Sequence, residues 1–247
     1  MTRTRFRPSA NGRLHLGGAF VAWQNYRSAK AKAGEFICLV DDVVPRMKYG
    51  PDWEPAKVEQ FCEGFVEDME WLGIAPDLTV FASQFAEAHA EVAAKVGAVR
   101  PAWDGPGLER YVWTTSQGGC CTSYHPWLVA GRVSDDHELG ITDFVRGADL
   151  LPEAQLYDWI AWQAYGYGYH VLQDYTGIVI APDTNDPCSK TAGGECIATY
   201  RARGVTPNEI IAVLKALSTS VDYGSYALRY MEVPADAVPL LLGRAAE

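Results

Sequence analysis

The sequence lacks any apolar run long enough to cross a membrane. No stretch approaches the roughly 18 consecutive apolar residues that suggest a membrane-spanning helix. The first residues are basic and polar, without the apolar segment of a signal peptide. We therefore expect a cytoplasmic protein with no membrane partner.

Cysteine is also scarce, with six residues at irregular spacings in a chain of 247. A disulfide framework is typical of much shorter secreted chains, so reduced thiols are expected. The adjacent pair Cys120-Cys121 lacks the spacing of a zinc knuckle. Zinc is therefore not expected, and would require Cys38 or His125 from elsewhere in the chain.

Basic residues are also few: the chain has 21 Lys and Arg residues and 31 Asp and Glu residues, which gives a net charge of −10. Proteins that bind nucleic acid tightly and without specificity usually carry a basic excess. This chain offers only a local basic cluster near its start, formed by Arg3, Arg5, Arg7 and Arg13. Any nucleic-acid acceptor is therefore expected to be bound over a small footprint.

The first part of the chain carries the strongest pattern. A short strand is predicted over residues 2–7, and a His-Leu-Gly-Gly segment opens a helix over residues 17–33. Backbone N–H groups at a helix start favour a phosphate, and glycines let it approach closely. His15 could donate to a developing phosphoryl charge. The alternative is an ordinary tight strand–helix turn.

A second strand is predicted over residues 35–40, and it completes a βαβ unit with a parallel sheet. Ligands of such sheets bind beyond the carboxyl ends of the strands, where Ser9 and Asp41 are expected to meet. Asp41 could instead simply cap a loop.

The remaining pattern is mixed. Residues 97–127 indicate mostly loop with a short strand near Tyr111, and an apolar pattern returns at 128–133. Helices are predicted over 55–72, 83–96 (on the surface), 152–169 and 210–217, strands over 141–145 and 177–181, and a polar loop over 182–194.

Three segments together resemble the class I glutamyl-tRNA synthetases. The start resembles Arg-Phe-x-Pro-Ser-x-x-Gly-x-Leu-His-x-Gly-Gly, and residues 133–151, with Asp135 and Asp136, resemble Val-Asp-Asp…Gly-Ile-Thr…Arg-Gly-Ala-Asp-Leu-Leu. Residues 187–190 resemble the Lys-x-Ser-Lys loop, with proline replacing the first lysine. In size the chain is closest to truncated paralogues such as glutamyl-queuosine tRNA(Asp) synthetase.

The resemblance implies an α/β fold, the Rossmann-like parallel sheet of a class I aminoacyl-tRNA synthetase. It places a catalytic domain at residues 1–190, with a reduced insertion at 97–127, and a helical C-terminal extension at 191–247. Only 57 residues follow Lys190, so no anticodon-binding domain is expected.

The resemblance also implies roles for individual residues. His15 and Lys190 would be catalytic, and Asp41 replaces a glutamate that holds the substrate ammonium. Arg146 would read the side-chain carboxylate of glutamate, which suits its bidentate guanidinium. A pocket tyrosine of the family falls on Leu128 by direct count, or on Tyr124 with an insertion. The amino-acid site would comprise Arg5, Ser9, Asp41 and Arg146, and the ATP site His15, Gly17, Gly18, Asp149, Ser189 and Lys190.

The implied reaction is amino-acid activation, with ATP split to AMP and pyrophosphate in the presence of Mg²⁺. Glutamate is the favoured amino acid, and a modified tRNA base or nucleoside is the favoured acceptor. One alternative keeps this chemistry but uses a modified DNA base or a small molecule as the acceptor. The other is a non-catalytic paralogue that binds a nucleotide or a protein.

Overall fold

The computed structural model describes residues 1–45, 55–98, 111–114, 120–123, 126–180, 188, 195–219 and 230–242. The chain begins with β1 (Arg3–Phe6), α1 (Leu16–Ala31) and β2 (Glu35–Val40). β1 and β2 pair in parallel from Arg3↔Glu35 to Phe6↔Cys38. The predicted βαβ unit is therefore confirmed.

The sheet extends from β2 to a third parallel strand. α3 (Pro55–Trp71) leads to β3 (Leu78–Phe81), which pairs with β2 from Ile37↔Leu78 onward. α3 buries Val58, Phe65 and Met69, which recur at helical spacing on one face. This helix agrees with the prediction.

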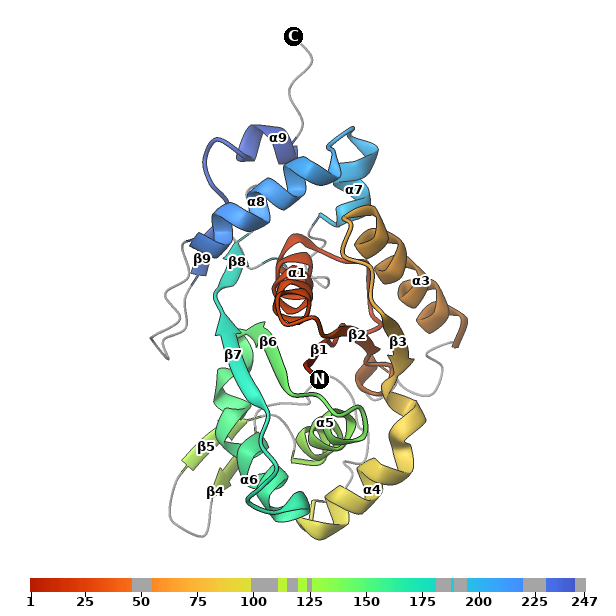
Figure 1. The fold of residues 1–247 in the computed structure, drawn as a ribbon, viewed down its shortest axis with the longest axis vertical. Helices are drawn as coiled ribbons and strands as arrows, with labels where there is room; N and C mark the ends of the chain where they lie inside the picture. The colour runs from red at the N-terminus through yellow and green to blue at the C-terminus, as the bar shows by residue number, and fades with distance from the viewer. Residues whose placement is uncertain are drawn as a thin grey trace.

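A second parallel pair lies on the other side of β1. It is formed by β6 (Asp143–Gly147) and β7 (Leu172–Thr176). Just before β6, the Thr142 N–H donates to the Arg3 carbonyl over 2.9 Å, and the Arg3 N–H donates to Thr142 Oγ1 over 3.0 Å. β6 therefore runs beside β1, and Figure 1 shows β6 and β7 on one side of β1, and β2 and β3 on the other.

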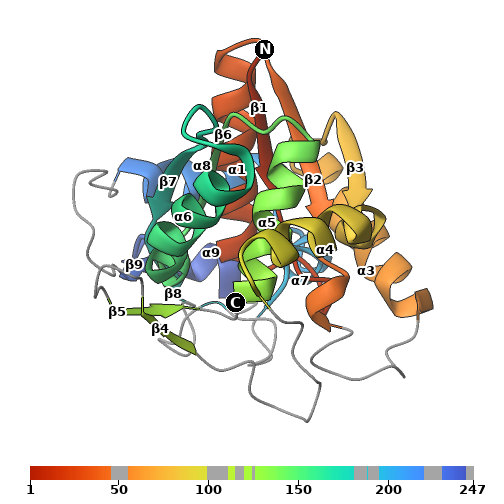
Figure 2. The same cartoon turned by 90° about the horizontal axis from the view of Figure 1, so that it is seen from below.

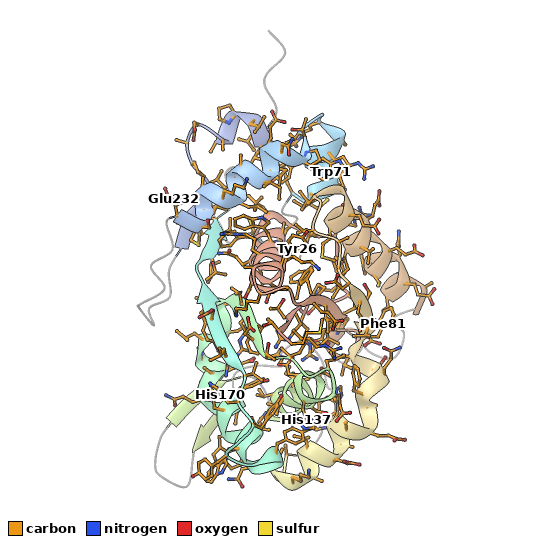
Figure 3. All side chains as sticks on the ribbon, viewed as in Figure 1. Tyr26, Trp71, Phe81, His137, His170 and Glu232 are labelled. Atoms are coloured by element: carbon orange, nitrogen blue, oxygen red, sulfur yellow. The ribbon has the colours of Figure 1, made fainter. Side chains whose placement is uncertain are left out.

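Two cores lie on opposite faces of β2, because alternate side chains of a strand point in opposite directions. Phe36, Cys38 and Val40 join the first core, while Ile37 and Leu39 join the second. Figure 2 shows α4 and α5 in front of the strands and α1 behind them. Figure 3 labels Tyr26 of α1, whose ring packs edge-on against Phe36 in the first core. The two ring centroids lie 5.9 Å apart.

The second core is built by α4 (Ala86–Lys95), α5 (Pro126–Glu138) and α6 (Ala154–Tyr165). The apolar pattern at 128–133 proves to be the buried face of α5. α4 follows a short 3₁₀ turn, η1 (Ala82–Phe85), and buries His89, Val92 and Ala93. The helix lies on the surface, as expected, and packs this one face on α5.

The helix expected over 152–169 is α6, which is shorter at both ends. Residues 148–153 form a 3₁₀ turn, η2 (Ala148–Glu153), so α6 begins only at Ala154, and it stops at Tyr165 because Gly166 takes a φ of +86°. β7 was not predicted. Two further strands, β4 (Tyr111–Thr114) and β5 (Cys120–Ser123), form an antiparallel hairpin, so the strand near Tyr111 is confirmed and its partner was missed.

The C-terminal segment is only partly as predicted. It contains α7 (Ile197–Ala202), α8 (Pro207–Thr219) and α9 (Val238–Leu242), but also a strand, β9 (Tyr230–Glu232). β9 pairs in parallel with β8 (Ile178–Ile180), so the tail is mainly helical, as expected, and also contributes one strand that was not predicted. Buried residues of α7, α8 and α9 join the first core with α1, while the boundary expected at residue 190 lies outside the described residues. Among the described residues, no helix is both long and apolar enough to span a membrane.

Candidate functional site

His15 caps the start of α1. Its backbone is extended (φ −93°, ψ 168°), and its Nδ1 accepts a hydrogen bond of 3.1 Å from the Gly18 N–H. This contact satisfies one of the unpaired donors at the helix start. Because Nδ1 accepts, a neutral ring carries its proton on Nε2. The capping bond thus leaves an N–H donor on the opposite edge of the imidazole.

The two glycines leave room for this ring. A Cβ on Gly17 would lie 3.3 Å from two ring atoms of His15, and a Cβ on Gly18 would lie 3.0 Å from Leu14 Cδ1. Larger residues would therefore push the ring or the Leu14 side chain from its place. The His-Leu-Gly-Gly segment packs as one unit at the helix start.

Both described ends of the Ser189-Lys190 loop lie at this unit. Cys188 has its Cβ 3.5 Å from the place of a Gly17 Cβ, and its N–H donates to the Val179 carbonyl over 2.8 Å. On the far side of the loop, the backbone of Cys196 forms an isolated antiparallel β-bridge with the backbone of His15. Ser189 and Lys190 themselves lie outside the described residues. The described residues on either side of positions 189–194 therefore lie beside the start of α1.

Ser9 and Asp41 meet beyond the carboxyl ends of β1 and β2, as predicted. Their backbones form an isolated parallel β-bridge, in which the Ala10 N–H donates to the Asp41 carbonyl over 2.9 Å. The Asp41 side chain is buried, with Oδ1 accepting from the Val43 and Val44 N–H groups over 3.2 and 3.0 Å.

Asp41 is an anion in this setting. Burial acts to raise the pKa of Asp41, but the Arg7 guanidinium and the Val44 N–H act against it, and the net result is a lowered pKa. Arg7 Nε lies 3.4 Å from Asp41 Oδ2. A buried carboxylate beside Ser9 can thus accept a cationic group.

A layer of buried ion pairs adjoins Asp41. We call it the arginine–carboxylate layer, and it comprises Arg5, Arg7, Arg132, Arg146, Asp41, Asp135, Asp136 and Glu153. Arg5 donates to both oxygens of Asp136, over 2.7 and 2.9 Å. The Tyr157 hydroxyl also donates to Asp136, over 2.8 Å. β1, α5, β6 and α6 with its preceding turn are held together by these contacts.

Arg146 is engaged within the same layer. Its Nη1 donates to Glu153 over 3.2 Å, and its Nη2 donates to Gln173 over 3.0 Å and to the Tyr175 hydroxyl over 2.7 Å. Its side chain is only 4% exposed. The expected roles of Arg5 and Arg146 in substrate binding stay predictions, and in this structure both arginines bind protein acceptors.

A small pocket opens beside Ser9 and Asp41. Its polar lining consists of Arg7, Asp41, His89 and Arg132, and its other walls are Val43, Val44, Trp127, Leu128 and Gly131. Leu128, the residue on which the pocket tyrosine falls by direct count, thus lines this pocket. The alternative, Tyr124, lies outside the described residues. Asp149 does not line this pocket and lies in the turn that follows β6.

Sequence reasoning missed the residues that complete this arrangement. Arg7 was noticed only as part of a basic cluster, and Arg132 and Glu153 carried no signal of their own. Asp135 and Asp136 belong to a segment that resembles the family, but no role was assigned to them. Among the described residues there is no group of three or more His, Cys, Asp or Glu suited to a metal, and the zinc prediction is not tested, because the side chains of Cys120 and Cys121 lie outside them.

Comparison with known proteins finds similarity to one family. Residues 1–96 match the family described as tRNA synthetases class I (E and Q), catalytic domain. A glutamate–tRNA ligase 2 from Neorickettsia sennetsu is 25% identical over 250 residues, covering 88% of this chain. A glutamate–tRNA ligase from Pyrococcus abyssi is 42% identical over 86 residues, covering 35% of this chain and 14% of that protein. The first 96 residues are thus similar to the catalytic domain of this family.

The fold agrees with this family. The glutamate–tRNA synthetase structure from Elizabethkingia anophelis superposes with a TM-score of 0.66 at 16% identity, covering 97% of this chain and 69% of that one. The domain is therefore a class I Rossmann-like α/β fold. The chain spans 56% of the Neorickettsia protein and 62% of a relative from Dinoroseobacter shibae, so it corresponds to little more than half of these relatives.

Proposed function

We propose that this domain activates an amino acid with ATP, forming an aminoacyl-adenylate and releasing pyrophosphate. The observation that carries the proposal is the meeting of three parts at one place. The capped start of α1 and the Ser9–Asp41 β-bridge follow the carboxyl ends of β1 and β2, and Cys188 and Cys196, on either side of the Ser189-Lys190 loop, lie beside the start of α1. Open α/β sheets bind their ligands beyond the carboxyl ends of their strands.

His15 and the loop lysine stabilise the phosphates. The Nε2–H of His15 donates to the oxygens that gain charge as pyrophosphate leaves, and Gly17 and Gly18 allow close approach to the helix start. Lys190 brings a cation from the adjoining loop, and Ser189 adds a hydroxyl donor. Asp149 accepts from the ATP ribose. Mg²⁺ arrives with the ATP phosphates, and we assign no protein ligand to it.

The amino acid binds between the helix start and the arginine–carboxylate layer. Its ammonium group pairs with Asp41 beside Ser9, because a buried anion with a lowered pKa favours a cation. Its carboxylate then faces the α-phosphorus of ATP, which it attacks. This step depends on positioning and charge stabilisation more than on a dedicated base.

Glutamate and a tRNA-type acceptor are the favoured substrates. Similar proteins carry the name glutamate–tRNA ligase, and one solved structure is described as a complex with its amino acid. The net charge of −10 limits long-range attraction to a nucleic acid. The acceptor is therefore bound over a small footprint, as suits a modified tRNA base or nucleoside.

ATP–pyrophosphate exchange with each standard amino acid tests the proposal. Each amino acid is assayed alone and with total tRNA, and labelled glutamate is followed into acid-precipitable tRNA. Exchange with glutamate in either arm is the expected result. Absence of exchange with every amino acid in both arms would contradict the proposal and favour a non-catalytic nucleotide-binding domain.

A further inference from the structure

We propose that His89 is a general base, and that it lets one water molecule hydrolyse the aminoacyl-adenylate when no acceptor takes the acyl group. Asp135 is the positioning residue that holds its imidazole ring. This inference rests on the proposed function and adds a second activity to it. The net result of both steps is an amino-acid-dependent conversion of ATP to AMP and pyrophosphate.

His89 is a buried titratable side chain that the activation step does not use. It lies on the face of α4 that packs on α5, and only 3% of its surface is exposed. Its Nε2 contacts Asp135 Oδ1 at 2.5 Å. Because a carboxylate accepts hydrogen bonds, the neutral ring carries its proton on Nε2 and keeps Nδ1 as an acceptor. The contact with Asp135 therefore leaves the basic nitrogen of the ring for another partner.

The imidazole lines the pocket beside Asp41, where a water molecule fits. The pocket has about 10 Å³ of free space, which is room for about one water. A bound water needs two to four polar partners, and His89, Asp41 and Arg7 all line the pocket. Among the described residues, Arg7 Nη1 is buried without a hydrogen-bond partner, although Nη2 lies 3.0 Å from Asp135. A water that donates to His89 and accepts from Arg7 would satisfy both groups.

Asp41 brings the reactive bond of the adenylate to this pocket. In the proposed complex, its carboxylate pairs with the ammonium group of the amino acid. The carbonyl carbon of any α-amino acyl group lies about 2.5 Å from that nitrogen. The carbon that water must attack therefore lies beside the pocket that Asp41 and His89 share. Val43 and Val44 form apolar walls there, which limit the access of other water molecules.

The reaction is a general-base hydrolysis. His89 Nδ1 takes a proton from the water, and the water oxygen forms a bond to the carbonyl carbon. The bond between that carbon and the phosphate oxygen then breaks, and AMP leaves with the electron pair. The products are AMP and the free amino acid, and the proton passes from His89 to solvent. The Asp135 carboxylate stabilises the imidazolium that forms in between.

A purely structural pair of His89 and Asp135 would have different requirements. Such a pair ties α4 to α5 through Nε2 alone, so any side chain that donates from that position would replace it. A glutamine amide places its nitrogen near the position of the imidazole Nε2, but it offers no base. His89→Gln therefore separates the structural contact from the proposed chemistry.

Turnover without an acceptor tests the inference. The full chain is incubated with ATP, Mg²⁺ and glutamate, or whichever standard amino acid supports pyrophosphate exchange. A second arm adds total tRNA oxidised with periodate, whose diols no longer accept an acyl group. AMP release is measured beside exchange, and hydroxylamine in a parallel sample traps the adenylate as a hydroxamate. The wild type should release AMP at least about tenfold faster than the adenylate decays in free solution. In oxygen-labelled water, the first turnover should place the label in the amino acid.

Two variants should lose hydrolysis and keep activation. His89→Gln should lower AMP release about tenfold or more and leave exchange within threefold of the wild type. Gly131→Ala adds a methyl group in the same pocket, 3.5 Å from ring atoms of His89, which is an ordinary contact. Gly131 lies within α5, where alanine favours the helix, so the variant should fold and exclude the water. His137→Gln, an exposed change near the end of α5, should alter neither rate.

Folding of each variant is checked by circular dichroism and thermal unfolding, and Gly131→Ala decides if His89→Gln does not fold. A wild type that releases AMP no faster than the free adenylate decays would overturn the inference. So would folded variants that release AMP at the wild-type rate, or variants that lose exchange and AMP release equally. In these cases exchange and hydroxamate formation by the wild type leave the activation chemistry intact. Absence of exchange and of hydroxamate in every arm would instead contradict the activation chemistry, and this inference with it.

Discussion

At the scale of single residues, His15 shows how one side chain serves structure and chemistry together. Its Nδ1 accepts from the Gly18 N–H and completes the start of α1. The same hydrogen bond directs the Nε2–H away from the helix. Because the two roles use different ring atoms, substitutions can separate them.

We expect His15→Asn to lose activity and keep stability. Asparagine is a good helix cap, but its shorter amide does not extend to the position of Nε2. The ATP–pyrophosphate exchange rate should fall by about two to three decades, as when one transition-state donor is removed. His15→Ala should show the same loss and also unfold about 2–4 °C lower, since a lost cap costs about 1 kcal/mol. A rate for His15→Asn within threefold of the wild type would refute the catalytic role.

The sequence predicted residues whose placement follows from nearby elements. His15, Gly17 and Gly18 lie at a helix start, and Ser9 and Asp41 follow two adjacent parallel strands. The partners of the arginines could not be predicted in this way. Arg5 pairs with Asp136, 131 positions away, and no local pattern indicates which of the 31 acidic residues will meet it.

At the scale of elements, β6 is tied to α1 by a buried asparagine. Asn25 Nδ2 donates to the Val145 carbonyl over 2.8 Å, and Asn25 Oδ1 accepts from the Val145 N–H over 2.9 Å. One amide side chain thereby satisfies both backbone groups of a β6 residue. This contact holds β6, which contains Arg146, against α1, whose start is capped by His15.

We expect Asn25→Ala to destabilise the protein strongly. It leaves two buried backbone groups unpaired, at a cost of about 3 kcal/mol in total. Thermal unfolding should occur roughly 6–12 °C lower. Arg27→Ala, an exposed change two residues along the same helix, should cost no more than about 1 kcal/mol. Equal unfolding temperatures for the two variants would contradict the role of Asn25.

Elements were predictable where local periodicity decides them and missed where long-range pairing does. β2 has a continuous apolar run and was predicted with its observed bounds, Glu35–Val40. β7 alternates between partly buried and exposed residues and gains its place by pairing with β6. β9 has three residues and exists as a partner of β8. Such strands carry too little pattern of their own.

At the scale of the whole molecule, stability depends on pH through a buried tyrosine beside the arginine–carboxylate layer. Burial and the neighbouring Asp136 raise the pKa of Tyr157 well above its usual value near 10. The folded protein therefore keeps the Tyr157 proton at a pH where the unfolded chain releases it. The stability linked to this proton is complete below pH 10 and is lost as the pH rises further.

We expect Tyr157→Phe to flatten the alkaline loss of stability. Above about pH 10, one such tyrosine lowers the free energy of unfolding by about 1.4 kcal/mol per pH unit. Urea unfolding at pH 9, 10 and 11 should show a slope smaller by about this amount in the variant. Tyr167→Phe is the control, because Tyr167 is 85% exposed. Identical slopes for Tyr157→Phe and the wild type would exclude the proposed linkage.

The central claim is that amino-acid activation occurs where the Ser189-Lys190 loop meets the start of α1. The most direct measurement is ATP–pyrophosphate exchange by Lys190→Ala beside Lys215→Ala, which removes an exposed lysine of α8. The account predicts that Lys190→Ala lowers the exchange rate by about two to three decades, because a charge-assisted contact to the reacting phosphates is lost. It predicts a rate within twofold of the wild type for Lys215→Ala. A Lys190→Ala rate that is also within twofold of the wild type would contradict the account.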